Sequence, residues 1–246
     1  MSELAPILKF HRATLETGRN YDSGISSADL ALGPGELGVI LLEREHPRLP
    51  LADLACGLAD PSSGEVLFQG LPWNSYPPAR AAKLRGLIGR VFDDGGWVNS
   101  LKVDQNVTLV QRHHTSRPVQ EIEDEAAGLA RAMGLPGLPR GQPWQGRRHD
   151  LRRAACVRAL LGQPILLLLE RPTSGGLTDL FSALVNQLRA ARARGAAVLW
   201  MTDDPREWAD VGLRPTFRGR MVGPQIMIDA TSPTMRANPA APRSGG

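Results

Sequence analysis

The chain has 246 residues, 42% of them hydrophobic, which is enough for one large α/β domain or two small ones. The net charge of +4 could suggest nucleic acid or a membrane surface, but only three of the 29 basic residues are lysines, which indicates a compositional bias, and no RNA-binding aromatic motif or zinc spacing occurs, so no nucleic-acid partner is expected. Cys56 and Cys156 provide no disulfide framework, and the sequence has no secretory signal and no apolar run of about 18 residues, so we expect a cytoplasmic protein.

The first third of the sequence predicts strands around one helix. Alternating apolar residues indicate an antiparallel edge sheet, and a Gly-Pro-Gly turn leads into a buried strand. Pro50 suits the first position of a helix, whose buried face includes Leu51, Leu54, Ala55 and Leu58. The expected elements are strands 7–15, 28–32, 36–42, 65–68 and 87–92, and helices 51–58 and 79–85.

The rest of the chain predicts a mainly helical stretch and then two buried strands. Helices are expected at 103–112, 119–133 and 151–161, so the region 94–161 is a candidate helical lobe. Strands 165–170 and 197–202 flank a helix whose apolar face begins at Leu177. The Pro/Ala/Ser/Gly composition of residues 230–246 predicts a disordered tail. Strands that alternate with helices predict an α/β fold with a mostly parallel sheet covered on both faces.

Three stretches carry a resemblance to a known family. They are "GLADPSSGEVLFQG", "LRGLIGRVFDDGGWVNSLKVDQNVTL" and "RALLGQPILLLLERPTSGG", which begin at Gly57, Leu84 and Arg158. In this order and spacing they resemble the segment behind the Walker A helix, the Q-loop region and the Walker B strand of ABC transporter ATP-binding subunits. The resemblance covers residues 5–229 and implies a P-loop NTPase-like ABC ATPase fold, with a mixed sheet, an antiparallel edge subdomain and a helical lobe. The stretch "DDGGWVNSLKVDQNVTLVQRHHT" is most similar to ATPases of Mla/MCE-type lipid transporters.

The phosphate-binding loop of that family is not matched. A P-loop needs glycines whose N–H groups surround the phosphates, a lysine for the β/γ-phosphates and a hydroxyl for Mg²⁺. The two glycine positions fall on Leu42 and Pro47, the lysine position on Arg48, and the hydroxyl positions on Leu49 and Pro50. Two prolines also remove two N–H donors.

The catalytic positions of the family are changed as well. The Walker B aspartate position is Glu170, and the position of the general-base glutamate is Arg171, which cannot accept a proton. Asp93 stands at the Q-loop glutamine, Asp203 at the switch histidine and Leu177 at the D-loop aspartate.

The ABC signature positions are also altered, and they bear on the dimer that the resemblance implies. They are Gly146, Arg147, Arg148, His149 and Asp150. The adenine-stacking position falls on Leu15, or on Tyr21 if a small insertion is allowed. In the family each ATP lies between the Walker A of one subunit and the signature of the other. Pairing this chain with an intact partner would therefore spoil both composite sites.

Charged residues replace the nucleotide-binding groups in this sequence. The carboxylates of Glu43, Glu45, Asp93, Glu170 and Asp203 are expected to converge, opposed by Arg44, Arg48 and Arg171. Unpaired carboxylates at about 4 Å would each repel a phosphate charge by roughly 4 kcal/mol at an effective dielectric near 20. We therefore expect the arginines to pair with the acids, for example Arg48 with Glu170.

A loop of the family type is retained after the Q-loop position. In the family this loop lies in the groove that receives the coupling helix of the membrane subunit. The resemblance therefore implies that Gly95, Gly96, Trp97 and Val98 contact a permease, with Trp97 as an exposed anchor. The alternative is that Trp97 packs back onto the helical lobe.

These observations favour a catalytically inactive ABC ATPase-like subunit, peripheral at the inner face of the membrane, which binds a permease and forms a dimer with itself or with another ABC ATPase. No catalytic residue, cofactor or metal site is expected. Two alternatives stay open: a divergent working ATPase that uses ATP and Mg²⁺, and a soluble scaffold or regulator outside transport.

Overall fold

The computed structural model describes residues 5–18, 21–42, 49–175 and 177–229, and it builds them around two sheets. The larger sheet has the order β10-β9-β3-β8-β7-β6, comprising Gln225–Ile228, Phe217–Val222, Leu37–Leu41, Ala197–Thr202, Leu166–Glu170 and Ile88–Val91. All of its neighbouring strands are parallel except β9 and β10. The smaller sheet is antiparallel, with the order β2-β1-β4-β5, comprising Ile25–Leu32, Leu8–Leu15, Ser63–Phe68 and Leu71–Pro72.

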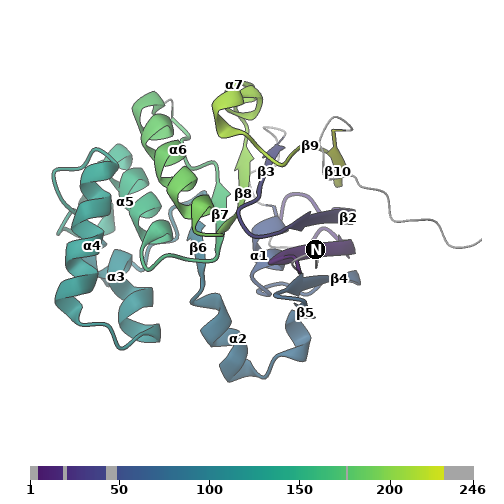
Figure 1. Ribbon diagram of the computed structural model, residues 1–246, viewed down its shortest axis with the longest axis horizontal. Helices are drawn as coiled ribbons and strands as arrows, with labels where there is room; N and C mark the ends of the chain where they lie inside the picture. Colours follow the sequence, from purple (N-terminus) through teal and green to yellow (C-terminus); the bar gives the residue numbers. More distant parts are fainter. Residues whose placement is uncertain (1–4, 19–20, 43–48, 176, 230–246) are drawn as a thin grey trace, which may run out of the picture.

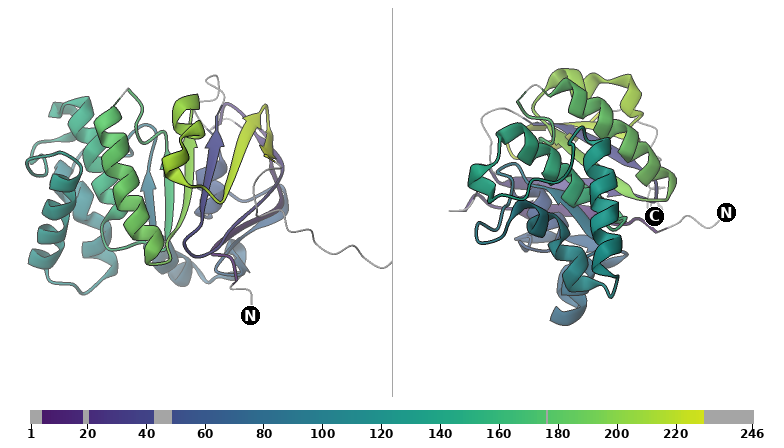
Figure 2. Two further views of the ribbon diagram at one scale, coloured as in Figure 1. Left: turned by 45° about the horizontal axis from the view of Figure 1, so that its top comes forward. Right: turned by 90° about the vertical axis from the view of Figure 1, so that its left-hand side faces the viewer.

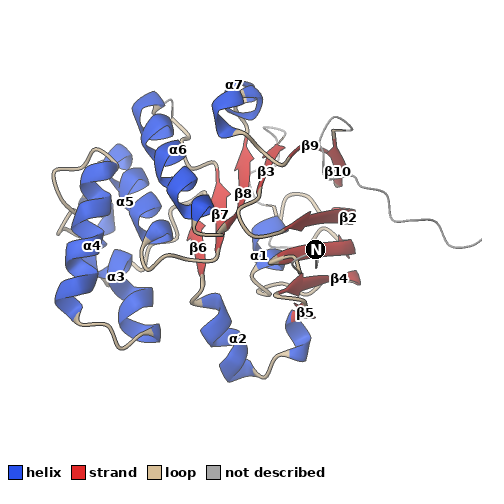
Figure 3. Cartoon of the chain, in the orientation of Figure 1, coloured by secondary structure: helices blue, strands red, loops and turns tan. Residues whose placement is uncertain are grey.

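The helices lie mainly on one face of the parallel sheet (Figures 1 and 3). They are α3, α4, α5 and α6, which cover Val103–His114, Val119–Ala132, Arg148–Leu160 and Thr178–Ala193. The first three contact one another, as expected of a helical lobe. Figure 2 shows from other directions that the parallel strands stand between these helices and the antiparallel sheet. Shorter helices are α1, α2 and α7, which cover Leu51–Ala55, Pro78–Arg85 and Pro205–Ala209, and 3₁₀ turns cover Trp73–Ser75, Pro143–Gln145 and Val211–Leu213.

Two apolar cores result from this layering. One fills the space between the parallel sheet and the helices, and the other lies between the two sheets and around α1. The central strands β7 and β8 contribute to both, because alternate side chains of a strand point to opposite faces of the sheet. Their sequences LLLLE and AVLWMT are buried throughout, apart from the half-buried Glu170, as expected for parallel strands covered on both faces.

Helix α1 is shorter than the sequence predicted. It ends at Ala55, and Leu58, expected on its buried face, is 60% exposed. Gly57 adopts a φ of +62° beside the ring of Trp73, where a Cβ would lie 2.4 Å from the ring. The chain leaves the helix at this glycine, so Leu58 turns outward. Pro50 is the N-cap residue and not the first helical residue.

The C-terminal part contains elements that the sequence did not predict. Strands β9 and β10 follow α7, and β9 pairs with β3 in parallel. The antiparallel strand β2 begins at Ile25, earlier than expected. The expected tail, residues 230–246, lies outside the described residues. Among the described residues, no helix is long and apolar enough to cross a bilayer.

Candidate functional site

The altered positions gather where several parallel strands end. Glu170 is the last residue of β7, whereas Leu42, Asp93 and Asp203 follow β3, β6 and β8 within one or two residues. The carboxyl ends of parallel strands share one edge of a sheet, which is where ligands bind in open α/β folds. A cavity of about 560 Å³ opens at this edge, lined among others by Tyr21, Leu49, Asp53, Arg90, Asp93 and Glu170. We refer to it as the strand-end cavity.

Arg90 links two carboxylates in the strand-end cavity. Its Nε lies 2.6 Å from Oε1 of Glu170, and its Nη1 lies 2.5 Å from Oδ1 of Asp53. The Arg90 side chain is 10% exposed and that of Glu170 is 16% exposed, so both charges are largely removed from water. Arg90 also packs on Phe92, with Cζ 4.3 Å from the ring centroid. Glu170 therefore pairs with Arg90, and Arg48, the expected partner, lies outside the described residues.

The pKa values of this pair reflect burial and attraction together. Burial alone would lower the pKa of Arg90, but its hydrogen bonds to Glu170 and Asp53 and the attraction of the Glu170 charge raise it overall. Burial also raises the pKa of Glu170, and the bond from Arg90 offsets only part of that rise. Glu170 thus depends on the guanidinium to offset the effect of its burial.

Arg171 forms the second link between strand ends. Its Nη1 lies 2.9 Å from Oδ2 of Asp93, and its Nε lies 3.5 Å from Oδ2 of Asp203. The Arg171 side chain is nearly buried, and its backbone has a φ of +42°, unusual for a residue with a side chain. The residue at the general-base position therefore holds the Q-loop and switch positions together. The sequence correctly indicated that arginines pair with acids here, although it named a different arginine for Glu170.

The entrance to α1 offers few groups for a phosphate. Leu49 and Pro50, at the two hydroxyl positions, are both buried, and Leu49 belongs to the core between the sheets. Leu42 is buried at the end of β3. Pro47 and Arg48, with the acids at 43 and 45, lie outside the described residues. In the described part of this entrance, apolar side chains stand where the hydroxyls would be needed.

Tyr21 reaches the cavity from the segment between β1 and β2. Its hydroxyl donates to Oδ2 of Asp53 at 2.9 Å. Burial and this hydrogen bond raise the pKa of Tyr21 to about 12. Of the two residues considered for the adenine position, Tyr21 lines the cavity, whereas Leu15 packs against the core between the sheets.

The signature positions surround the start of α5. Arg147 is the N-cap residue and has no side-chain cap bond. Arg147, Arg148 and His149 are exposed, while Gly146 and Asp150 are half-buried. Only Arg148 of these lines the strand-end cavity, and with Gly146 it also lines a neighbouring cavity next to Trp144. The signature segment therefore presents basic side chains where the family has glycine and serine donors.

The same arrangement of sheets and helices occurs in solved structures of transport proteins. The bacterial ABC transporter cassette MJ0796, described as a dimer, matches with a TM-score of 0.75 and 18% identity over 89% of this chain and 96% of its own. The chain has the fold of an ABC ATP-binding cassette. CbiO1 from Clostridium perfringens, described as part of the ABC transporter complex cbiONQ, matches with a TM-score of 0.67 and 22% identity over 90% of this chain and 87% of its own.

A third structure agrees with these two. It is described as an ATP-binding subunit of an ABC transporter, and it matches with a TM-score of 0.73 and 15% identity over 89% of this chain and 88% of its own. No family model matches the sequence. The cassette fold is thus shared with proteins whose sequences differ from this one at most positions.

The loop after β6 of the cassette is fixed by side chains of the helical lobe. Arg152 donates to the carbonyls of Phe92 and Asp93, and Arg158 donates to those of Gly95 and Gly96. Asn106 is buried and closes the loop, because its amide donates to the carbonyl of Val98 at 3.0 Å and its Oδ1 accepts from the N–H of Val98 at 2.8 Å.

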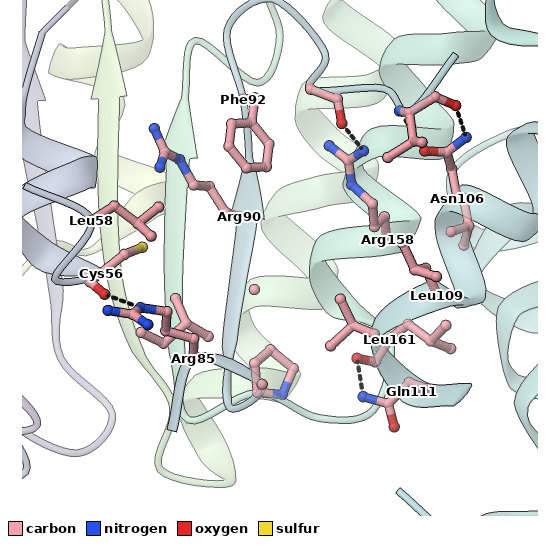
Figure 4. Close-up of a pocket in the computed structure, with 18 residues that line it drawn as sticks. Cys56, Leu58, Arg85, Arg90, Phe92, Asn106, Leu109, Gln111, Arg158 and Leu161 are labelled. Atoms are coloured by element: carbon pink, nitrogen blue, oxygen red, sulfur yellow. Dashed lines mark hydrogen bonds between the residues drawn. The ribbon is translucent and has the colours of Figure 1, made fainter. Parts of the chain in front are cut away.

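A groove lies between the cassette core and the helical lobe (Figure 4). We refer to it as the interlobe groove, and it encloses about 250 Å³. Leu58, Arg85 and Arg90 line it from the core, and Leu109, Val110 and Arg158 line it from the helices. Of the four residues expected to contact a partner, Gly96 and Val98 line this groove. Gly95 and Trp97 line the neighbouring cavity beside Trp144.

Trp97 is half-buried, and not exposed as the sequence suggested. It packs against the core of the helical lobe, and the guanidinium carbon of Arg158 lies 4.6 Å from its ring centroid. We expect Trp97→Ala to lower the free energy of unfolding by about 2 kcal/mol through lost packing and cation–π contact. Urea denaturation would measure this. Trp144→Ala is the matched control, since Trp144 is 67% exposed and should change stability by less than about 0.5 kcal/mol. If Trp97→Ala changes stability as little as the control is expected to, Trp97 has no structural role.

The sequence missed the residues that hold this site together. Arg90, Arg152 and Arg158 match no nucleotide-binding motif, and Asp53 was not counted among the acids. One signal was available. Arg90 occupies an inner position of an expected buried strand, where a charged residue needs a partner.

Proposed function

We propose that this chain is a nucleotide-independent ABC ATPase-like subunit that binds a membrane permease at the inner face of the membrane. The observation that carries this proposal is the pair of ion-pair links at the strand ends. Arg90 joins Asp53 to Glu170, and Arg171 joins Asp93 to Asp203. These links hold the strand ends together with protein charges, in the region where the fold's nucleotide positions lie.

A triphosphate would be disfavoured in this arrangement. To approach the strand ends it would have to separate Arg90 from two carboxylates, and leaving a buried charge unpaired costs several kcal/mol. It would gain no lysine, and no Mg²⁺ hydroxyl from Leu49 or Pro50. Proton transfer from water also has no acceptor at Arg171. We therefore propose that the chain has a structural or regulatory role that does not require ATP hydrolysis.

We expect no binding of Mg-ATP tighter than a dissociation constant of about 1 mM, equivalent to roughly −4 kcal/mol. Calorimetric titration of the full chain would measure it, with a thermal-shift titration as an independent readout. ATP without Mg²⁺ serves as the control for nonspecific phosphate binding to the exposed arginines of the signature segment. A micromolar dissociation constant would instead favour the divergent working ATPase.

The partner side of the proposal is supported by the interlobe groove. The groove leaves apolar side chains exposed to water, among them Leu58, Val98 and Leu109. Contact with a partner would remove these apolar surfaces from water, which is energetically favourable. CbiO1, which has the same fold, is described as part of a transporter complex. The chain can be purified from native membranes together with its partners. A polytopic membrane protein in the purified complex would identify the chain as a transporter subunit, and its absence would favour a soluble scaffold.

The transported substrate is proposed to be a lipid, because the loop from Asp93 onward resembles that of Mla/MCE-type ATPases. Dimerisation with a second copy or with another ABC ATPase is part of the same proposal, since MJ0796 with this fold is described as a dimer. Phospholipid that co-purifies with the permease complex would support lipid transport, and its absence from an intact complex would argue against it.

A further inference from the structure

Another cavity lies between the loop after β7, the start of α6 and the segment that contains α7. It encloses about 430 Å³, and we refer to it as the α6–α7 cavity. Its wall carries two apolar side chains, those of Leu177 and Phe181, and three carboxylates, those of Asp204, Glu207 and Asp210. The cavity therefore places hydrocarbon and negative charge side by side.

Two of these three carboxylates are already compensated. Oδ2 of Asp204 lies 2.7 Å from Nη2 of Arg206, whose side chain is 85% exposed. Oδ1 of Asp210 accepts from the N–H of Gly212 at 2.7 Å. Glu207 differs from both, because it forms no ion pair with any residue that the structure describes. One charge in the cavity is thus left without an ion-pair partner within the described chain.

Glu207 is held by neutral donors. Its Oε1 accepts from the hydroxyl of Thr173, and its Oε2 accepts from Oγ1 of Thr202 at 2.7 Å. Burial raises the pKa of Glu207, and these hydrogen bonds offset part of that rise. Hydroxyl groups stabilise an ionised carboxylate but supply no positive charge. A cation in the cavity would supply that charge, and charge-assisted hydrogen bonds are stronger than those between neutral groups.

Two buried polar atoms beside the cavity have no hydrogen-bond partner in the described part of the chain. They are Oγ of Ser174, a residue that lines the cavity, and Nε1 of the fully buried Trp200. Buried polar groups in proteins nearly always have a partner. The indole can only donate, and it lies near enough to Glu207 to lower the pKa of that carboxyl group. The hydroxyl of Ser174 can also accept, so it offers a second acceptor to a ligand.

The apolar part of the cavity is fixed by packing. Leu177 is buried, and the half-buried ring of Phe181 lies edge-on to that of Trp200, with ring centroids 5.6 Å apart. A matching ligand needs positively charged N–H donors at one end and hydrocarbon at the other. A protonated primary amine on an apolar chain meets both needs, because an ammonium group has three donors and no acceptor.

We propose that the α6–α7 cavity binds a protonated primary amine on a short apolar chain. The ammonium group pairs with Glu207 and donates to the hydroxyl of Ser174, and the chain packs on Leu177 and Phe181. This site goes beyond the proposed function, and it depends neither on the permease contact nor on the loss of ATP binding. The ligand is a free amine; the side chain of a partner's lysine offers the same chemistry and is tested beside it.

Probes that share a hexyl chain test this on the full-length protein at pH 7. They are hexylamine, hexyltrimethylammonium and hexanol, and NMR titration measures their binding. Hexylamine is protonated at this pH, as a lysine side chain is. We expect hexylamine to bind about tenfold more tightly than hexanol, as for one charge-assisted hydrogen bond. Hexyltrimethylammonium should bind more weakly than hexylamine, because it carries the charge without an N–H donor.

Variants locate the site. Glu207→Gln should bring the affinity for hexylamine to within about threefold of that for hexanol. Asp94→Asn is the matched control, because Asp94 is an exposed carboxylate of the strand-end cavity, which Ser174 also lines. This control should keep the full preference for hexylamine. Ser182→Trp fills the α6–α7 cavity from an exposed position of α6 and should weaken the binding of every probe, so the test does not depend on the folding of Glu207→Gln.

Several results would overturn the proposal. Equal binding of hexylamine and hexanol to the wild-type chain would show that the charge of Glu207 has no role, and undetectable binding of hexylamine would show that the cavity is not an amine site. A preference that survives Glu207→Gln and disappears in Asp94→Asn would place the amine in the strand-end cavity instead. Nα-acetyl-lysine methylamide is the probe for the other source. If it binds more tightly than hexylamine and is lost in Glu207→Gln, the carboxylate site is correct but its ligand is a lysine side chain and not a free amine.

Discussion

Replacing Arg90 with methionine is expected to lower the free energy of unfolding by about 3 kcal/mol or more. The substitution leaves Asp53 and Glu170 without their shared guanidinium in a site where Glu170 is only 16% exposed. Removal of one partner from a buried ion pair costs about 3–5 kcal/mol, because the remaining charge is uncompensated. Two carboxylates would here lose the same partner. Urea denaturation at neutral pH measures the change.

The chain provides a control of the same kind at its surface. Arg112 pairs with Glu123 at 2.6 Å, but these side chains are 40% and 50% exposed. Arg112→Met should therefore cost less than about 1 kcal/mol, as is usual for exposed pairs. A comparable loss in both variants would show that burial of the Arg90 pairs is unimportant.

The penalty of Arg90→Met should also depend on pH. Burial already raises the pKa of Glu170, and the hydrogen bond from Arg90 lowers that pKa. Loss of this hydrogen bond would therefore raise the pKa of Glu170 further. A carboxyl group with a higher pKa in the folded state than in the unfolded state destabilises the protein as pH rises through the folded-state value. The variant should therefore recover part of its stability as the pH falls from 7 towards 5. If the loss of stability caused by Arg90→Met instead became larger as the pH falls from 7 to 5, Glu170 would not be the unpaired charge.

The second large effect is expected at the interlobe groove. The double variant Leu58→Gln, Leu109→Gln should reduce retention of the permease in the purified complex more than tenfold, because both side chains lose apolar contact at the centre of the proposed interface. The stability of the isolated chain should change little, since Leu58 is 60% and Leu109 40% exposed. Quantitative mass spectrometry of the complex measures the retention.

A matched double variant is available outside the groove. Leu71 and Leu87 are 51% and 40% exposed and do not line it, so Leu71→Gln, Leu87→Gln should leave retention unchanged. Equal loss in both variants would indicate a general effect of surface polarity. If both double variants retain the permease fully, the permease docks on a surface other than the groove.

The amino-acid sequence by itself determined most of the sheet and the helical lobe. Runs such as LLLLE at β7 and AVLWMT at β8 suit only strands that are covered on both faces, and the structure confirms both. The resemblance of three short stretches was sufficient for the fold, which the solved cassettes share. The strand β9, FRGRMV, was missed because a glycine stands at the inward position between Phe217 and Met221, which are buried, and glycine is depleted in strands.

Only the tertiary structure decided which charges meet at the strand ends. Arg90 lies on β6, 37 residues from Asp53 of α1 and 80 residues from Glu170 of β7. Sequence motifs locate positions along one chain, and they identified Glu170 and Arg171 as altered. The pairing of Glu170 with Arg90 instead depends on two parallel strands, β6 and β7, which bring these side chains together at the cavity. Because ion pairs form between whichever charges the sheet brings within about 3 Å, local pattern alone could not name them.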